Sequence, residues 1–208
     1  MPIEIIDLAS DSRIADWVEA RLNLALKAAG DKPIAISVPG GSTPFPIFAD
    51  LVDRDLDWSR ISVWPGDDRI VPEDNPASNV GRIRAILEPP GTKVVALSEQ
   101  AKPPHFALVW LGMGADGHVA SLFPKHRLLD EREAGFAWLD DSPKPPATRV
   151  TMTKRVLANA SLTRVVLATG AGKRDALQKL IDGDGELPIA QLGPLTVVTD
   201  QHFTKTGL

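Results

Sequence analysis

Residues 108–124 read LVWLGMGADGHVASLFP, so an apolar run ends in a glycine-rich turn that carries a histidine. Gly112, Gly114 and Gly117 fit the pattern G-x-G-x-x-G, which binds dinucleotides where a strand precedes it and a long helix follows. Here Pro124 follows Gly117 within seven residues and leaves room for little helix. The pattern is therefore only weak evidence for a nucleotide site.

The alternative is that these glycines shape a tight loop that exposes Asp116 and His118. An imidazole with a pKa of about 6.5 is mostly neutral at pH 7 and can accept a proton from water. Asp116 could orient the ring or contact a substrate. A lone histidine in a loop can also be structural or merely exposed, so the residues alone leave both interpretations open.

A second loop, SVPGGSTPF at residues 37–45, runs from an apolar segment into a helix start. Gly40 and Gly41 let the backbone approach a ligand closely, and Ser42 or Thr43 can cap a helix whose first turn contains Pro44. Free N–H groups and the helix dipole would form an anion site there. An ordinary strand-to-helix turn with a cap is the alternative.

Two more loops carry charges directly after apolar runs. Asp67, Asp68 and Arg69 follow one run, and an arginine there can fork onto a phosphate while the aspartates hold it or contact sugar hydroxyls. Lys173 stands at the expected start of a helix, where it could add a cation to an anion held by backbone N–H groups. The alternatives are a solvated ion pair and a surface lysine.

The elements that must position these loops alternate between two kinds. Short runs that are apolar nearly throughout predict strands covered on both faces, at residues 34–38, 61–64, 106–111, 164–169 and 195–199. Helical spacing or capping predicts helices over residues 14–25 with an end near Gly30, and over 44–52, 79–87 (capped by Ser78-Asn79) and 172–181. Residues 140–148, DDSPKPPAT, read as a polar surface loop. This alternation predicts an α/β fold with a mostly parallel sheet, and ligands bind such sheets at the carboxyl ends of the strands.

The composition favours one soluble globular domain over residues 1–208, with 43% hydrophobic and 24% charged residues. The net charge of −4 lacks the basic excess that nucleic acid attracts. The longest apolar stretch, around residues 106–111, falls far short of the roughly 18 residues of a membrane span. Acidic residues at the amino terminus replace the basic ones of a secretory signal, so we expect a cytoplasmic location.

Metal and thiol chemistry are not expected. The chain has no cysteine, which excludes disulfides, thiolate metal sites and a cysteine nucleophile. Its four histidines show no spacing typical of zinc sites, and its carboxylates form no obvious ligand set. We therefore expect neither a metal nor a cofactor.

The loops occur together in a familiar order. The series GGSTP, DDR-x-VP…SN, LGMGADGHVASLFP, RVTMT and G-x-x-K resembles the 6-phosphogluconolactonases, which are related to the glucosamine-6-phosphate deaminases. The resemblance extends from the first strand to PIAQL near residue 190, and DGHVASLFP is its most specific part. The deaminases share DGH but continue with Asn-Glu-Pro, where this chain has Leu122-Phe123-Pro124. The missing glutamate helps to position the ring-opening histidine in the deaminases, so its absence favours a lactonase.

The resemblance implies a three-layer α/β sandwich of modified Rossmann type, with helices on both faces of the sheet. It implies hydrolysis of 6-phospho-D-glucono-1,5-lactone to 6-phospho-D-gluconate, the second step of the oxidative pentose phosphate pathway. His118 would be the general base, with Asp116 beside it. The substrate-binding residues would be Gly40, Gly41, Ser42, Thr43, Asp67, Arg69 and Lys173. Asp68 stands where the family usually has glutamate, and Asn75 where it often has histidine, so we assign neither a role.

The expected partner is thus a phosphorylated sugar lactone, without nucleic acid or membrane. We expect a monomer with a functional link to glucose-6-phosphate dehydrogenase, which makes the lactone. Three alternatives stay open: a sugar-phosphate isomerase similar to glucosamine-6-phosphate deaminase, a non-catalytic sugar-phosphate sensor, and a nicotinamide-dependent oxidoreductase.

Overall fold

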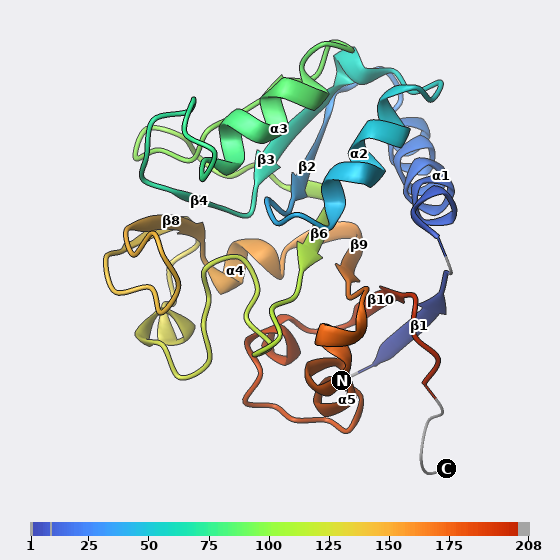
Figure 1. Cartoon of the computed structure of the whole chain (residues 1–208). Coiled ribbons are helices and arrows are strands. Elements are labelled where there is room, and N and C mark those ends of the chain that lie inside the picture. The colour runs from blue at the N-terminus through green and yellow to red at the C-terminus, as the bar shows by residue number, and fades with distance from the viewer. Residues whose placement is uncertain (1, 9, 204–208) are drawn as a thin grey trace.

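Seven parallel strands form the central sheet (Figure 1). The computed structural model describes residues 2–8 and 10–203, and only the backbone at residues 161–163. The spatial order of the strands is β1 (Ile3–Asp7), β10 (Leu195–Thr199), β9 (Ala160–Leu167), β6 (Phe106–Gly112), β2 (Ile34–Val38), β3 (Ile61–Pro65) and β5 (Lys93–Val94). Every neighbouring pair is parallel. The predicted α/β fold with a mostly parallel sheet is confirmed.

The central strands are apolar throughout because helices and loops cover both of their faces. All five residues of β2 are buried, and so are most of those in β6. The strand predicted at residues 164–169 is displaced: β9 begins at Ala160 and ends at Leu167. Thr163 and Arg164 interrupt the apolar run, which hid the first half of this strand from the sequence. The edge strands β1 and β5 were not predicted.

Three helices cover one face of the sheet (Figure 1). They are α1 (Asp11–Ala29), α2 (Pro44–Val52) and α3 (Asn79–Leu87). The bounds of α2 and α3 match the prediction, and α1 ends as expected at Gly30, whose φ of 60° suits glycine. Ser78 caps α3, and its hydroxyl accepts a hydrogen bond from the backbone N–H of Gly81.

The opposite face carries α4 (Lys154–Leu157), α5 (Arg174–Ile181) and a second, antiparallel sheet. That sheet consists of β4 (Asp67–Arg69), β8 (Arg149–Met152) and β7 (Phe136–Leu139). Helix α5 starts two residues later than predicted, because a 3-10 turn occupies 171–173. The smaller sheet was not predicted, and its first strand reads Asp-Asp-Arg, which has no apolar residue.

The strand order places a crevice above the middle of the main sheet. From β2 the chain moves to β3 on one side, and it later returns to β6 on the other side of β2. The loops that follow these strands therefore diverge in opposite directions, and such switch points are where open α/β sheets bind ligands.

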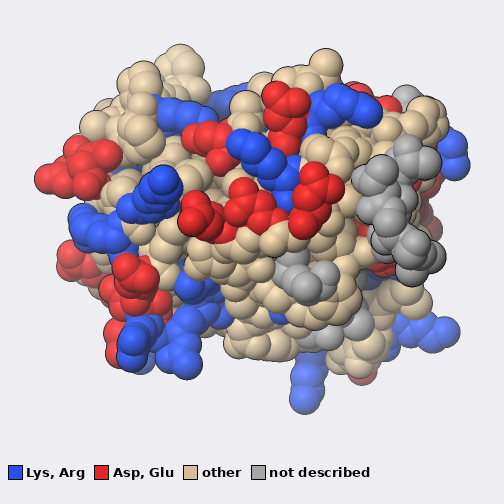
Figure 2. All heavy atoms as spheres, turned by 90° about the horizontal axis from the view of Figure 1, so that it is seen from below, with Lys and Arg blue, Asp and Glu red and all other residues tan. Residues whose placement is uncertain are grey.

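No helix in the described part of the chain is both long and apolar enough to cross a membrane. Figure 2 shows one face of the molecule, on which acidic and basic side chains are interspersed.

Candidate active site

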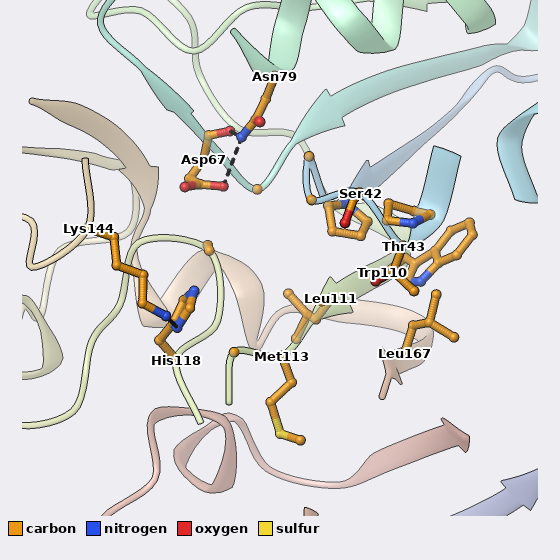
Figure 3. Close-up of a pocket in the computed structure, with 18 of the residues that line it drawn as sticks. Ser42, Thr43, Asp67, Asn79, Trp110, Leu111, Met113, His118, Lys144 and Leu167 are labelled. Carbon is orange, nitrogen blue, oxygen red and sulfur yellow. Dashed lines mark hydrogen bonds between the residues drawn. The ribbon is translucent and has the colours of Figure 1, made fainter. Parts of the chain in front are cut away.

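A cavity of about 320 Å³ lies at the carboxyl ends of β2, β3, β6 and β9 (Figure 3). The residues that line it come from loops distant in the sequence, which parallel strands bring to one edge of the sheet. The predicted site residues in its wall are Gly40, Gly41, Ser42, Thr43, Asp67, Arg69, His118 and Lys173. Asp116, the remaining predicted residue, is not in the wall but contacts His118 directly.

His118 and Asp116 form a tight pair. Nδ1 of His118 lies 2.5 Å from Oδ1 of Asp116, and a carboxylate can only accept, so the ring donates Nδ1–H. Nε2 then carries the lone pair, and it makes no hydrogen bond within the described chain. The ring packs on Phe123, with 4.9 Å between centroids. The glycine-rich loop thus presents an oriented imidazole to the cavity.

Gly114 makes this pairing possible. A Cβ at position 114 would lie 1.9 Å from Nδ1 of His118 and 2.4 Å from Oδ1 of Asp116. No α-helix follows the glycines, because only turns and a short bridge between Val119 and Leu122 separate Gly117 from the 3-10 turn at 127–130. The G-x-G-x-x-G pattern therefore lacks the helix of a dinucleotide site.

Burial and charge keep the pair as neutral imidazole and carboxylate. Burial lowers the pKa of His118 below its ordinary 6.5, and Lys144 lowers it further, which together outweigh the opposite effect of Asp116. Burial raises the pKa of Asp116, but the hydrogen bond from His118 and the charges of His118 and Lys144 lower it to about 2. The group facing the cavity at neutral pH is therefore an unprotonated base.

The loop of residues 40–43 leads into α2. Thr43 occupies the N-cap position, but its side chain makes no capping hydrogen bond. Pro44 and Pro46 have no N–H, so the donors for an anion at this end come from the loop and from Phe45. Arg82 supports the loop from α3, donating from Nη1 to the carbonyl of Gly40 at 3.3 Å and stacking 3.9 Å from the Phe45 ring.

Asp67 is the centre of a buried hydrogen-bond network in the cavity wall. Ser121 Oγ donates to its Oδ2 at 2.6 Å, and Asn79 Nδ2 donates to its carbonyl at 2.9 Å and its Oδ1 at 3.3 Å (Figure 3). Arg149 Nη1 lies 3.7 Å from Oδ2. A Cβ at Gly40 would lie 2.0 Å from the Asn79 side chain, so glycine is required there for this packing.

Asp68 points away from the cavity and anchors α3. Its Oδ1 accepts from the backbone N–H groups of Asn79 at 2.6 Å and Arg69 at 2.8 Å, and its Oδ2 accepts from Val80 at 3.2 Å. The side chain of Asn75, the other departure from the family pattern, accepts a local hydrogen bond from the backbone N–H of Ala77 at 2.9 Å. Neither residue lines the cavity.

Cations line much of the wall. Arg69 donates from Nη1 to the carbonyl of Ala77 at 2.7 Å, while its buried Nε has no partner within the described chain. Burial lowers the pKa of Lys173, and nearby Lys144 lowers it further, against the effect of Asp116. Burial likewise lowers the pKa of Arg149. Lys144 pairs with Asp116 and Arg149 lies near Asp67, whereas Arg69 and Lys173 form no ion pair with any carboxylate of the described residues.

Three polar residues of the wall were missed by sequence reasoning: Asn79, Lys144 and Arg149. Asn79 and Arg149 stand in the motifs SN and RVTMT, and that context was the available signal. Lys144 lies in the segment predicted to be a polar surface loop, and no local pattern marked it as a site residue.

Comparison with known proteins identifies the family. The family model described as glucosamine-6-phosphate isomerases/6-phosphogluconolactonase matches residues 9–101 and 90–203. A probable 6-phosphogluconolactonase of Schizosaccharomyces pombe is 31% identical over 92% of this chain and 85% of its own length. A rice protein, probable 6-phosphogluconolactonase 4, chloroplastic (Oryza sativa subsp. indica), is 33% identical over 70% of this chain, which spans only 57% of the rice protein.

The fold gives the same result. The crystal structure of a 6-phosphogluconolactonase from Shewanella baltica superimposes with a TM-score of 0.80 at 25% identity, covering 96% of this chain and 97% of that one. The chain therefore belongs to the glucosamine-6-phosphate isomerase/6-phosphogluconolactonase family.

Proposed function

We propose that the protein hydrolyses 6-phospho-D-glucono-1,5-lactone to 6-phospho-D-gluconate, the second step of the oxidative pentose phosphate pathway. The observation that carries the proposal is one cavity whose wall contains an oriented imidazole, His118, together with the cations Arg69 and Lys173. Relatives of this family named 6-phosphogluconolactonase support the choice of substrate.

His118 is the proposed general base. Its Nε2 takes a proton from water while the water oxygen attacks the lactone carbonyl carbon. The bond from that carbon to the ring oxygen then breaks, and the imidazolium returns the proton to the departing oxygen. Asp116 fixes the ring and its tautomer through Nδ1–H and stabilises the transient imidazolium by its charge.

The phosphate is held away from the reacting carbon. Arg69 and Lys173 supply positive charge, and the loop of residues 40–43 supplies backbone N–H groups and two hydroxyls. Binding the phosphate there positions the lactone ring against His118. The binding energy of the phosphate thereby offsets the entropy cost of orienting the reacting carbon. Backbone N–H groups of the glycine-rich loop are the proposed donors to the oxyanion.

Proton release on addition of freshly generated lactone tests the activity, because the acid product ionises at neutral pH. The rate must exceed a blank, since δ-lactones hydrolyse spontaneously. We expect His118→Ala to lose at least about 100-fold in kcat while still binding the product. Undiminished activity of this variant would contradict the proposal. Ammonia release from glucosamine-6-phosphate would instead identify a deaminase.

The finer expectations about partners and location are also proposals. We propose a monomer that acts on the product of glucose-6-phosphate dehydrogenase, and light scattering of the purified protein tests the oligomeric state. A cytoplasmic location stays a prediction, since the rice relative is named chloroplastic.

A further inference from the structure

The loop of residues 140–148 places a lysine next to the His118–Asp116 pair. Lys144 Nζ lies 3.1 Å from Nδ1 of His118 and 3.3 Å from both carboxylate oxygens of Asp116. Figure 3 shows its side chain beside His118, on the same side of the cavity. Because Nδ1–H already donates to Asp116, the ammonium acts on the ring as a charge and on the carboxylate as a donor.

Arg149 fixes the backbone that carries this lysine. Its guanidinium donates from Nη2 to the carbonyls of Lys144 at 2.8 Å and Pro145 at 3.3 Å, and from Nε to that of Pro146 at 3.0 Å. Arg149 is 3% exposed, so these three hydrogen bonds are shielded from water. Ser142 adds a turn, with its hydroxyl donating to the carbonyl of Lys144 at 2.9 Å.

Hydrogen bonds from Arg149 and Ser142 thus fix the backbone that carries Lys144. Lys144 and His118 are 26 residues apart in the sequence, and both contact Oδ1 of Asp116. A surface lysine would normally remain hydrated, and a buried arginine would normally pair with an acid. Here the buried arginine mainly donates to backbone carbonyls of the loop, which holds the lysine where it meets the pair.

We propose that Lys144 is a positioning residue of the reaction, and that Arg149 holds it in place through the backbone of residues 144–146. The ammonium donates a hydrogen bond that holds the Asp116 carboxylate in place, and its charge disfavours protonation of the adjacent ring. His118 therefore rests as a neutral base with Nε2 toward the cavity. The kinetic part of this inference rests on the proposed function, whereas the ionisation of His118 does not.

The charged groups that face His118 come from three elements. Asp116 lies on its own loop, Lys144 on the loop of residues 140–148, and Asp67 on β4. The two acids raise the pKa of His118, and burial and Lys144 lower it. Lys173 is a further cation nearby, through its interaction with Lys144. Removal of Lys144 therefore takes away a cation that lowers the pKa of His118, while Asp116 and Asp67, which raise it, remain.

Titration of the His118 ring by NMR in the ligand-free protein tests the inference without any substrate. The His118→Ala variant assigns its signal among the four histidines. We expect the pKa of His118 to rise by about half a unit or more in Lys144→Met. Lys144→Arg, which keeps the positive charge, should stay close to wild type. Lys93→Met, at an exposed position on β5, is the matched control.

Kinetics give the second measurement. In Lys144→Met the acid limb of the kcat profile should move to higher pH, so the loss in kcat should be larger at pH 6 than at pH 7.5. A shift of half a pKa unit lowers the fraction of neutral base by about threefold at most, so we expect an extra loss of up to about threefold at the lower pH, with KM within about twofold of wild type. Lys144→Gln provides a second neutral side chain if the methionine variant does not fold.

An unchanged His118 pKa in both neutral variants would overturn the inference. So would a large rise in KM with an unshifted pH profile, because Lys144 would then act as a substrate contact. If the wild-type protein hydrolyses no lactone, the proposed function fails, while the NMR titration still decides what Lys144 does to His118.

Discussion

Gly114 shows how strongly one residue can constrain the site. Its hydrogen atom occupies the space where a Cβ would meet both His118 and Asp116. Its φ is not in the left-handed region, so the backbone itself would accept alanine. The requirement for glycine therefore comes from the side-chain pair and not from the turn.

We predict that Gly114→Ala separates this pair and lowers kcat by about 100-fold, because the ring loses its tautomer and its orientation. The side chains can swing away, so the fold should survive and circular dichroism should remain unchanged. Gly135→Ala is the matched control, since a Cβ there meets nothing within 4 Å. Wild-type kcat in Gly114→Ala would show that the pairing is dispensable.

The ionisation of His118 predicts the pH dependence of the proposed reaction. Because its pKa lies below 6.5 in the folded protein, the neutral base accumulates as pH rises through that lower value. We therefore expect kcat/KM to rise from about pH 5 and to be level by pH 7. A midpoint above 6.5, after subtraction of spontaneous hydrolysis, would contradict this assignment.

At the scale of elements, Asp68 couples β4 to the start of α3. The carboxylate accepts three backbone hydrogen bonds. The N–H groups at the start of a helix have no partner within the helix, and here the carboxylate takes the place that water would otherwise fill. Burial raises the pKa of Asp68, and the hydrogen bonds oppose that effect. The acid of the DDR motif that lies outside the cavity is thus a structural anchor.

We predict that Asp68→Ala lowers the free energy of unfolding by about 2 kcal/mol, since two or more N–H groups lose their acceptor. The midpoint of urea unfolding measures this loss. Asp74→Ala, at an exposed position in the following turn, should leave the midpoint within error. Equal midpoints for the two variants would mean that water replaces the Asp68 carboxylate.

The elements that were predicted well have local signals. Pro44 and the Ser78 cap mark the starts of α2 and α3, and short runs that are apolar nearly throughout mark the covered strands. The smaller sheet has weaker signals, because β4 is polar and the other two strands are only four residues long. The buried network around Asp67 and the packing of β7 and β8 on the apolar core beneath the main sheet support its strands.

The same distinction explains which site residues were found. Gly40–Thr43, Arg69, His118 and Lys173 follow apolar strands, and parallel strands bring such loops to one edge. Lys144 and Arg149 reach that edge through the smaller sheet and its loop, so their placement depends on long-range packing that no local pattern encodes.

At the scale of the whole molecule, the cavity joins the two layers that cover the main sheet. One wall comes from the loop before α2 and from Asn79 on α3, and the other from the smaller sheet and the turn before α5. A ligand that bridges these walls binds only the folded chain, so it must raise the free energy of unfolding.

We predict that 6-phosphogluconate at about 100 times its Kd stabilises the fold by about 2.7 kcal/mol, which raises Tm by roughly 5 °C or more. The increase should shrink at high salt, because the phosphate is bound by charge. Lys173→Met should weaken binding by about tenfold or more, through loss of one charge-assisted contact. Lys179→Met, at an exposed position on α5, should retain the full increase in Tm. If both variants respond as the wild type does, the phosphate is not held at the start of α5, and the lactone must lie differently in the cavity.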